Sequence, residues 1–243
     1  MLKFLIITVL PITLLLLYIN KKDKEKPEPR NKLAACFGLG MLGGLVGSLI
    51  SGIFNWLGIG WGYNSVLFGD IISNGIISIL AVSIVYLILW KYSEKNPDFD
   101  EFFDGPVYAV FILFGYQLIY DLFNVGSDEW YMIGLLSATG YVVLYVMALI
   151  IGHYFSLAFF KQMELTGWNK FKMWIIPVAI MWFYNVTVNW LNSTVIGSIF
   201  AFLFCVAFAY FAYKKNNSIV AELTEKDLDE ANIEKGPLSD YVE

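Results

Sequence analysis

The chain has 243 residues, of which 58% are hydrophobic and 15% are charged, and its formal net charge is −5. A soluble domain carries about 25% charged residues, and no soluble core of this length could bury such long blocks of Leu, Ile, Val and Phe. Lipid can cover them, because an α-helix satisfies its own backbone polar groups inside a bilayer. The composition therefore excludes an ordinary soluble enzyme, predicts an all-α membrane helix bundle, and gives no reason to expect a nucleic-acid partner.

The first apolar run, Phe4–Tyr18, could be a signal peptide or a first membrane span. It is followed by Asn20 and a group of lysines, not by a small-residue cleavage site. A secretory signal peptide ends at such a site. We therefore expect an uncleaved span.

Polar segments divide the chain into about seven apolar stretches. Each approaches or exceeds the ~20 residues that a helix needs to cross ~30 Å of hydrocarbon. We therefore predict one transmembrane bundle over 1–213, with spans near 2–20, 34–57, 66–90, 106–125, 130–158, 171–191 and 193–213.

Basic residues alternate between successive loops. The first, third and fifth loops and the C-terminal tail hold 15 of the 16 Lys and Arg residues, and Lys3 is the remainder. Cytoplasmic loops carry an excess of Lys and Arg. We therefore expect the N-terminus outside and the C-terminus in the cytoplasm.

The second span is dense in glycine. Gly40, Gly44 and Gly47 lie on or near one helix face, at the small-xxx-small spacing that lets membrane helices approach closely. Close packing within the bundle is one interpretation, and a homodimer seam through these glycines is the other.

The segment 214–243 has a different composition from the rest. It carries eight acidic residues against four lysines and has little apolar content. Such a composition buries too little surface to fold alone. We predict an acidic cytoplasmic tail that is disordered, or a frayed helix near 218–230.

Ionisable side chains inside the spans are few, and each is a candidate functional group because charge in a bilayer is costly. Asp70 and Asp121 lie near the outer ends of the third and fourth spans, and His153 lies in the inner part of the fifth. Gln117 precedes Asp121 by one turn, so these two can bind each other. At ~1.5 Å per residue, His153 and Asp121 differ in depth by on the order of 20 Å and cannot share one ion or water.

The sequence offers no recognisable metal ligand set. His153 is the single histidine, no HExxH motif is present, and Cys36 and Cys205 lie inside apolar spans without CxxC spacing. Structural and catalytic metals need several such ligands together. We predict no metal and no cofactor.

The third loop is the most patterned polar stretch and ends in Asp104-Gly105-Pro106. Asp104 can cap the following helix, and Pro fits the first turn. We expect three aromatic side chains to hold this loop against the bundle, namely Phe99, Phe102 and Phe103.

The loop segment Phe99-Asp-Glu-Phe-Phe-Asp-Gly-Pro-Val-Tyr108 resembles the FDExxDGxVYG segment of the PrsW family. Those proteins are bacterial polytopic proteases that make a first cut in membrane-anchored anti-sigma factors. The resemblance runs from about residue 7 to 160 and implies a multi-pass protein of the bacterial cytoplasmic membrane. Its loop motif consists of Phe99, Asp100, Glu101, Asp104, Gly105 and Tyr108.

The groups that this resemblance would assign to catalysis are mostly missing. The family's EExxK motif falls on 81–85, where Ala81, Val82 and Val85 replace two acids and a lysine. Its Glu-Asn pair falls on Tyr120-Asp121, which keeps one carboxylate shifted by one position. Its histidine falls most naturally on Tyr141, and His153 is a rival candidate at the wrong depth. Hydrolysis needs a base or metal ligands and a group that stabilises the oxyanion. We therefore expect a non-catalytic pseudoprotease that binds a transmembrane or juxtamembrane segment of a single-span protein.

Two other functions stay open. An active protease could use displaced groups, such as Asp70, Asp121 and His153, on membrane-anchored regulators. A small transporter or channel could line a polar path with Asp70, Gln117, Asp121, Asn185 and Asn189. The sequence has no inverted repeat between its halves, which is the usual pattern of transporters.

Overall fold

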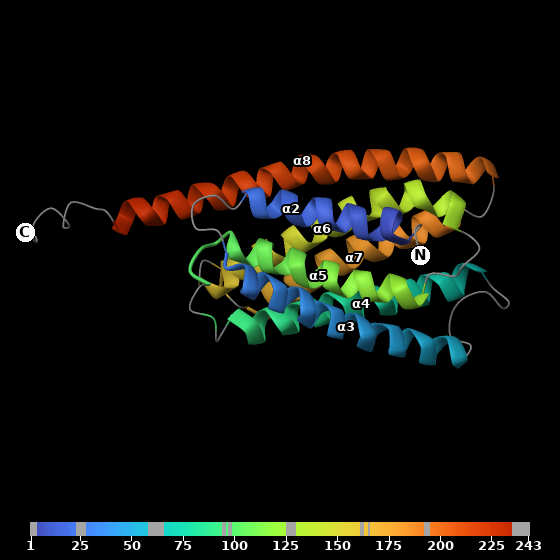
Figure 1. Ribbon diagram of the computed structural model, residues 1–243, viewed down its shortest axis with the longest axis horizontal. Coiled ribbons are helices and arrows are strands. Elements are labelled where there is room, and N and C mark those ends of the chain that lie inside the picture. Colours follow the sequence, from blue (N-terminus) through green and yellow to red (C-terminus); the bar gives the residue numbers. More distant parts are fainter. Residues whose placement is uncertain are drawn as a thin grey trace, which may run out of the picture.

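The computed structural model describes residues 4–22, 28–57, 66–93, 96, 99–124, 130–160, 163–164, 166–191 and 195–234, and over these it is all-α. Figure 1 shows the helices side by side in one elongated bundle. In chain order the helices are η1 (Leu5–Val9), α2 (Leu10–Lys22), α3 (Arg30–Trp56), α4 (Val66–Ser93), α5 (Asp104–Asn124), α6 (Trp130–Phe159), α7 (Gly167–Leu191) and α8 (Val195–Glu234).

Six helical segments among the described residues are long and apolar enough to cross a membrane. They are Leu5–Lys22, Arg30–Phe54, Ile71–Ser93, Asp104–Phe123, Gly140–Phe159 and Gly167–Val188. This confirms the prediction of a multi-pass helical membrane protein. The seventh predicted span, 193–213, corresponds to the first half of α8, which is not among the six.

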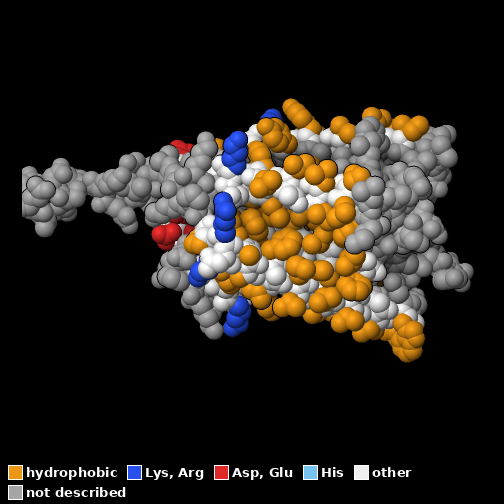
Figure 2. Space-filling view, in the orientation of Figure 1, with side chains coloured by type: hydrophobic (Ala, Val, Ile, Leu, Met, Phe, Trp, Pro, Cys, Tyr) orange, Lys and Arg blue, Asp and Glu red, His pale blue; other side chains and the backbone are white. Residues whose placement is uncertain are grey.

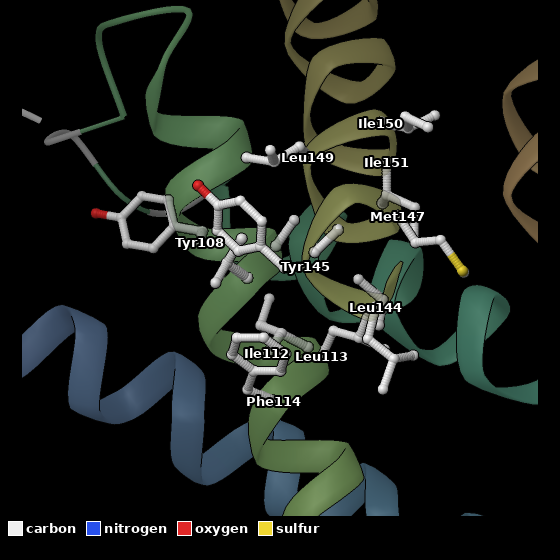
Figure 3. Packing of buried hydrophobic residues seen from close by; sticks show 14 of the residues in the cluster. Tyr108, Ile112, Leu113, Phe114, Leu144, Tyr145, Met147, Leu149, Ile150 and Ile151 are labelled. Carbon is white, nitrogen blue, oxygen red and sulfur yellow. The ribbon is translucent and has the colours of Figure 1, made fainter. Parts of the chain in front are cut away.

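The buried core lies mainly on α5 and α6. The protein buries 67% of the α6 span and 56% of the α5 span, against 17% of the first span. Figure 3 shows side chains of both helices packed together, with Leu113 of α5 and Met147 of α6 among them. The first span therefore lies at the rim of the bundle, where lipid covers most of it.

Glycines bring α3 and α5 into close contact. A Cβ added at Gly40 would lie 2.0 Å from the carbonyl oxygen of Ile112, and one added at Gly44 would lie 2.4 Å from that of Tyr116. Residues without a Cβ are needed for such an approach. The glycine face is thus filled by α5 of the same chain, and a homodimer through Gly40, Gly44 and Gly47 would require α3 to leave α5.

The outer surface of the bundle is apolar and has a basic border. Figure 2 shows hydrophobic side chains over the middle of one face and Lys and Arg side chains in a row along its left edge. Lys and Arg side chains are common just outside the hydrocarbon region, beside the lipid headgroups. This border marks one end of the apolar zone.

The acidic segment beyond the apolar half of α8 is helical through Glu234. Of the two expectations, disorder and a frayed helix near 218–230, the structure has helix over that range. Ile219 is buried, with 2% of its surface exposed. The carboxylate of Glu222 lies 3.9 Å from Nε2 of His153 on α6. Contact with α6 therefore supports the helix over this acidic segment. Residues 235–243 lie outside the described part.

Candidate functional site

Three of the polar positions suggested by the sequence meet in a small cluster of α5 and α6. The Tyr141 hydroxyl donates to Oδ2 of Asp121 over 2.5 Å. The Gln117 amide donates to Oδ1 of the same carboxylate over 2.6 Å. The predicted pairing of Gln117 and Asp121 is therefore confirmed, and Tyr141 joins it from the neighbouring helix.

The first turns of the chain close this cluster. Thr8 lies in the π-helical turn η1, is 2% exposed, and is within hydrogen-bonding reach of Tyr141. Single π-turns are rare and are often found at functional sites. Here the turn brings the N-terminal helix against the α5–α6 pair.

Hydrogen bonds hold the carboxylate of Asp121 on both of its oxygens. Both of its carboxylate oxygens already accept a hydrogen bond. A general base must reach the proton of an attacking water directly or through one water, and the phenol of Tyr141 supplies no base near neutral pH. The cluster can hold two helices together, because Asp121 is bonded both to its own helix and to α6.

The residues at the positions of the EExxK motif are apolar, and their surroundings are apolar as well. Ala81, Val82 and Val85 are 0% exposed and belong to the same hydrophobic cluster as Tyr141. Tyr120 stacks on Tyr116, with ring centroids 5.9 Å apart and planes at 9°. These side chains pack, and the described contacts bring no carboxylate to 81–85.

The other histidine or carboxylate candidates are His153 and Asp70. His153 has 14% of its side chain exposed and contacts Glu222 of α8. Asp70 lies in the first turns of α4, but its side chain is outside the described residues. Among the described residues, no three His, Cys, Asp or Glu side chains are grouped as a metal would require.

A second polar cluster, which we call the inner network, lies at the other end of α5 and involves the third loop. Asp104 is 1% exposed, and its Oδ2 accepts hydrogen bonds from the backbone N–H groups of Asp100 and Glu101, over 2.9 and 2.8 Å. The sequence predicted that Asp104 would cap the helix after it. In the structure, Oδ2 of Asp104 holds the turn before the helix, because that turn folds back over the carboxylate.

Tyr108 is the centre of the inner network. Its hydroxyl donates to the carboxylate of Glu28 and accepts from the Asn96 amide over 3.0 Å. Lys32 then donates to Oδ1 of Asn96 over 2.9 Å. These contacts join the start of α3, the third loop and the first turns of α5.

Glycine and aromatic residues fix the same loop sterically. A Cβ on Gly105 would lie 2.7 Å from the carbonyl oxygen of Gly152, so α5 begins in direct contact with α6. Phe99, Phe102 and Phe103 are at most 5% exposed, which confirms that they hold the loop against the bundle. Phe99 packs on Phe159 with ring centroids 4.8 Å apart.

Sequence reasoning missed the partners of Tyr108 in the inner network. Glu28 and Asn96 are 5% and 7% exposed, yet both come from segments that read as polar loops. Each is followed by proline, which restricts the preceding residue to extended backbone. That pattern marks an ordered loop end and could have drawn attention to both residues.

Comparisons of the chain with protein-family models, with curated proteins and with solved structures found no match. The resemblance to PrsW therefore rests on the residues of the loop and of the first spans alone.

Proposed function

We propose that this chain is a PrsW-like membrane protein that binds a transmembrane segment of a partner and does not hydrolyse it. Asp121 carries the proposal. It is the one carboxylate that survives near the family positions within the bundle, shifted by one residue, and Gln117 and Tyr141 each donate to one of its oxygens. The apolar packing at Ala81, Val82 and Val85 supports the same conclusion.

The proposed topology has seven spans in a bacterial cytoplasmic membrane, with the first half of α8 as the seventh. The N-terminus then lies outside, and the inner network lies at the cytoplasmic end. The distribution of Lys and Arg supports this orientation. Cysteine-accessibility labelling of single cysteines at Ser193 and Ser218 should place them on opposite sides of the membrane.

The inner network supports a binding role because it fixes the third loop in one conformation. Rigid surfaces lose less entropy when they bind a partner. On the membrane-facing side, the outer face of α3 offers an apolar stripe, in which Leu42 and Leu49 are 60% and 69% exposed. A partner helix on this stripe would pack opposite the face that the glycines give to α5.

Site-specific photo-crosslinking in cells tests the proposal. A photoreactive residue at Leu49 should capture a single-span membrane protein. The same residue at Phe183 of α7, which is 58% exposed, serves as the matched control and should not capture it. Equal capture at both positions, or a monomer without partners after mild detergent extraction, would contradict the binding role.

A proteolytic outcome is tested on a reconstituted single-span substrate. If the wild-type protein cleaves it, and both Asp121→Asn and His153→Ala abolish cleavage, the chain is an active PrsW-type protease and the proposal is wrong. The expected result is no cleavage by the wild type beyond that of empty vesicles.

A further inference from the structure

A groove of about 420 Å³ opens between α2, α3 and α5. Its apolar walls include Leu17 of α2 and Leu33 and Phe37 of α3, and Phe111 of α5 also lines it. Thr13 also lines the groove, and its hydroxyl donates a hydrogen bond to the backbone carbonyl of Val9 over 2.8 Å. The walls therefore present no unbound hydroxyl to a ligand and suit a hydrocarbon chain.

The groove is polar at one end. Asn20 and Arg30 also line it, and they lie in the last turn of α2 and at the first residue of α3. Along α3, the lining residues Arg30 to Phe37 span roughly 10 Å at 1.5 Å per residue. A charged mouth is thus followed by about 10 Å of apolar wall, which is the polarity profile of a phospholipid.

The charge at the mouth is positive. Arg30 is exposed, and Lys21 and Lys22 are exposed in the last turn of α2. The first turn of α3 contains no acidic residue. Arginine binds phosphate with two parallel hydrogen bonds, so this mouth complements an anionic headgroup.

We propose that the groove binds one acyl chain of an anionic phospholipid, with the phosphate at Arg30. Size favours this occupant over a partner helix. A helix is about 10 Å wide and rises 5.4 Å per turn, so 420 Å³ accommodates about one turn. A spanning partner needs ~30 Å of contact, whereas a groove of ~10 Å lies within one leaflet. The lipid site is separate from the partner surface proposed on α3, and each can fail without the other.

Native mass spectrometry of the full chain in mild detergent tests this site. Phosphatidylglycerol and phosphatidylcholine with identical acyl chains are added in parallel. We expect phosphatidylglycerol to be retained roughly fivefold more, which corresponds to one basic residue near a membrane surface. Arg30→Gln should lower its retention to the level of phosphatidylcholine.

Two further variants separate the headgroup from the chain. Lys91→Gln removes an exposed basic residue at the end of α4, away from the groove lining, and should leave the preference for phosphatidylglycerol within about twofold of wild type. Ala34→Phe places a ring in the groove from an exposed lining position and should lower retention of both lipids. Unchanged elution volume and unfolding temperature would show that these variants are folded.

Three results would overturn the lipid site. Equal retention of both lipids by the wild type would remove the headgroup preference. Equal effects of Arg30→Gln and Lys91→Gln would reduce it to general surface charge. A detergent-stable dimer that Ala34→Phe dissociates would make a second copy of the chain the occupant.

Discussion

Replacing Gly40 with alanine should separate α3 from α5 and destabilise the whole bundle. The added Cβ would lie 2.0 Å from the backbone oxygen of Ile112, about 1.4 Å short of the 3.4 Å at which ordinary contact begins. A backbone oxygen cannot rotate away as a flexible side chain can. The helices must therefore move apart by on the order of 1 Å along this contact.

The cost follows from the contacts that this movement weakens. A gap of about 0.5–1 Å already removes a quarter to a half of the dispersion energy of each atom pair. Overpacking typically costs about 1–3 kcal/mol, and more when the backbone must shift. We therefore expect Gly40→Ala to lower the free energy of unfolding by about 3 kcal/mol. For a chain of this size that corresponds to roughly 6–12 °C in the unfolding temperature.

The assay is thermal unfolding of the purified protein in detergent, followed by tryptophan fluorescence. Gly38→Ala is the matched control, because a Cβ at Gly38, two residues away on the same helix, meets nothing within 4 Å. Alanine also favours helix over glycine by about 1 kcal/mol, so the control should be neutral or stabilising. If both variants unfold at the same temperature, the close packing of α3 on α5 is wrong.

Three further predictions concern the polar clusters and use the same unfolding assay. Tyr141→Phe should cost about 1–2 kcal/mol, because Asp121 loses one of its two donors; an unchanged stability would mean that the cluster does not join α5 and α6. Tyr108→Phe should cost about 2–3 kcal/mol by leaving the buried carboxylate of Glu28 without that donor, whereas Tyr210→Phe, at a position 62% exposed, should cost almost nothing. Glu222→Gln should change stability by about 0.5 kcal/mol or less, because the Glu222 side chain is 47% exposed and lies 3.9 Å from His153. A loss above about 2 kcal/mol would mean that this pair is essential for docking α8.

The helices could be predicted closely because lipid-covered apolar sequence has few alternatives to helix. The stretches expected at 66–90 and 130–158 are observed as α4 (Val66–Ser93) and α6 (Trp130–Phe159). Inside a bilayer every backbone polar group needs a partner in the same segment. Long apolar blocks therefore fix the type and the approximate ends of these helices before any tertiary contact is known.

The partners of the polar residues were harder to predict because they are distant in the sequence. The bond between Gln117 and Asp121 joins residues four apart on one helix, a spacing that the helical period makes visible. The bond between Tyr108 and Glu28 joins residues 80 apart. No local pattern encodes that pairing, which depends on how α3 and α5 pack.

The acidic part of α8 is a longer helix than the sequence predicted, for a related reason. Its composition was judged as if it stood alone, and a charged segment without a core has too little apolar surface to remain folded. Ile219 is nevertheless buried against the hydrophobic cluster. One buried side chain on a helix that is already nucleated upstream extends the helix at a lower cost than a new nucleus would require.

The contacts of α5 connect the packing to the proposed role. Near its C-terminal end Asp121 is bonded to Tyr141 of α6, and near its N-terminal end Tyr108 is bonded to Glu28 before α3. Between them, Ile112 lies against Gly40 at backbone distance. Alternating access requires one group of helices to rock against another, and intramembrane hydrolysis requires water at a titratable group. The proposed binding role requires neither, and a central helix that is held at three levels can serve it as a rigid support on which another helix packs.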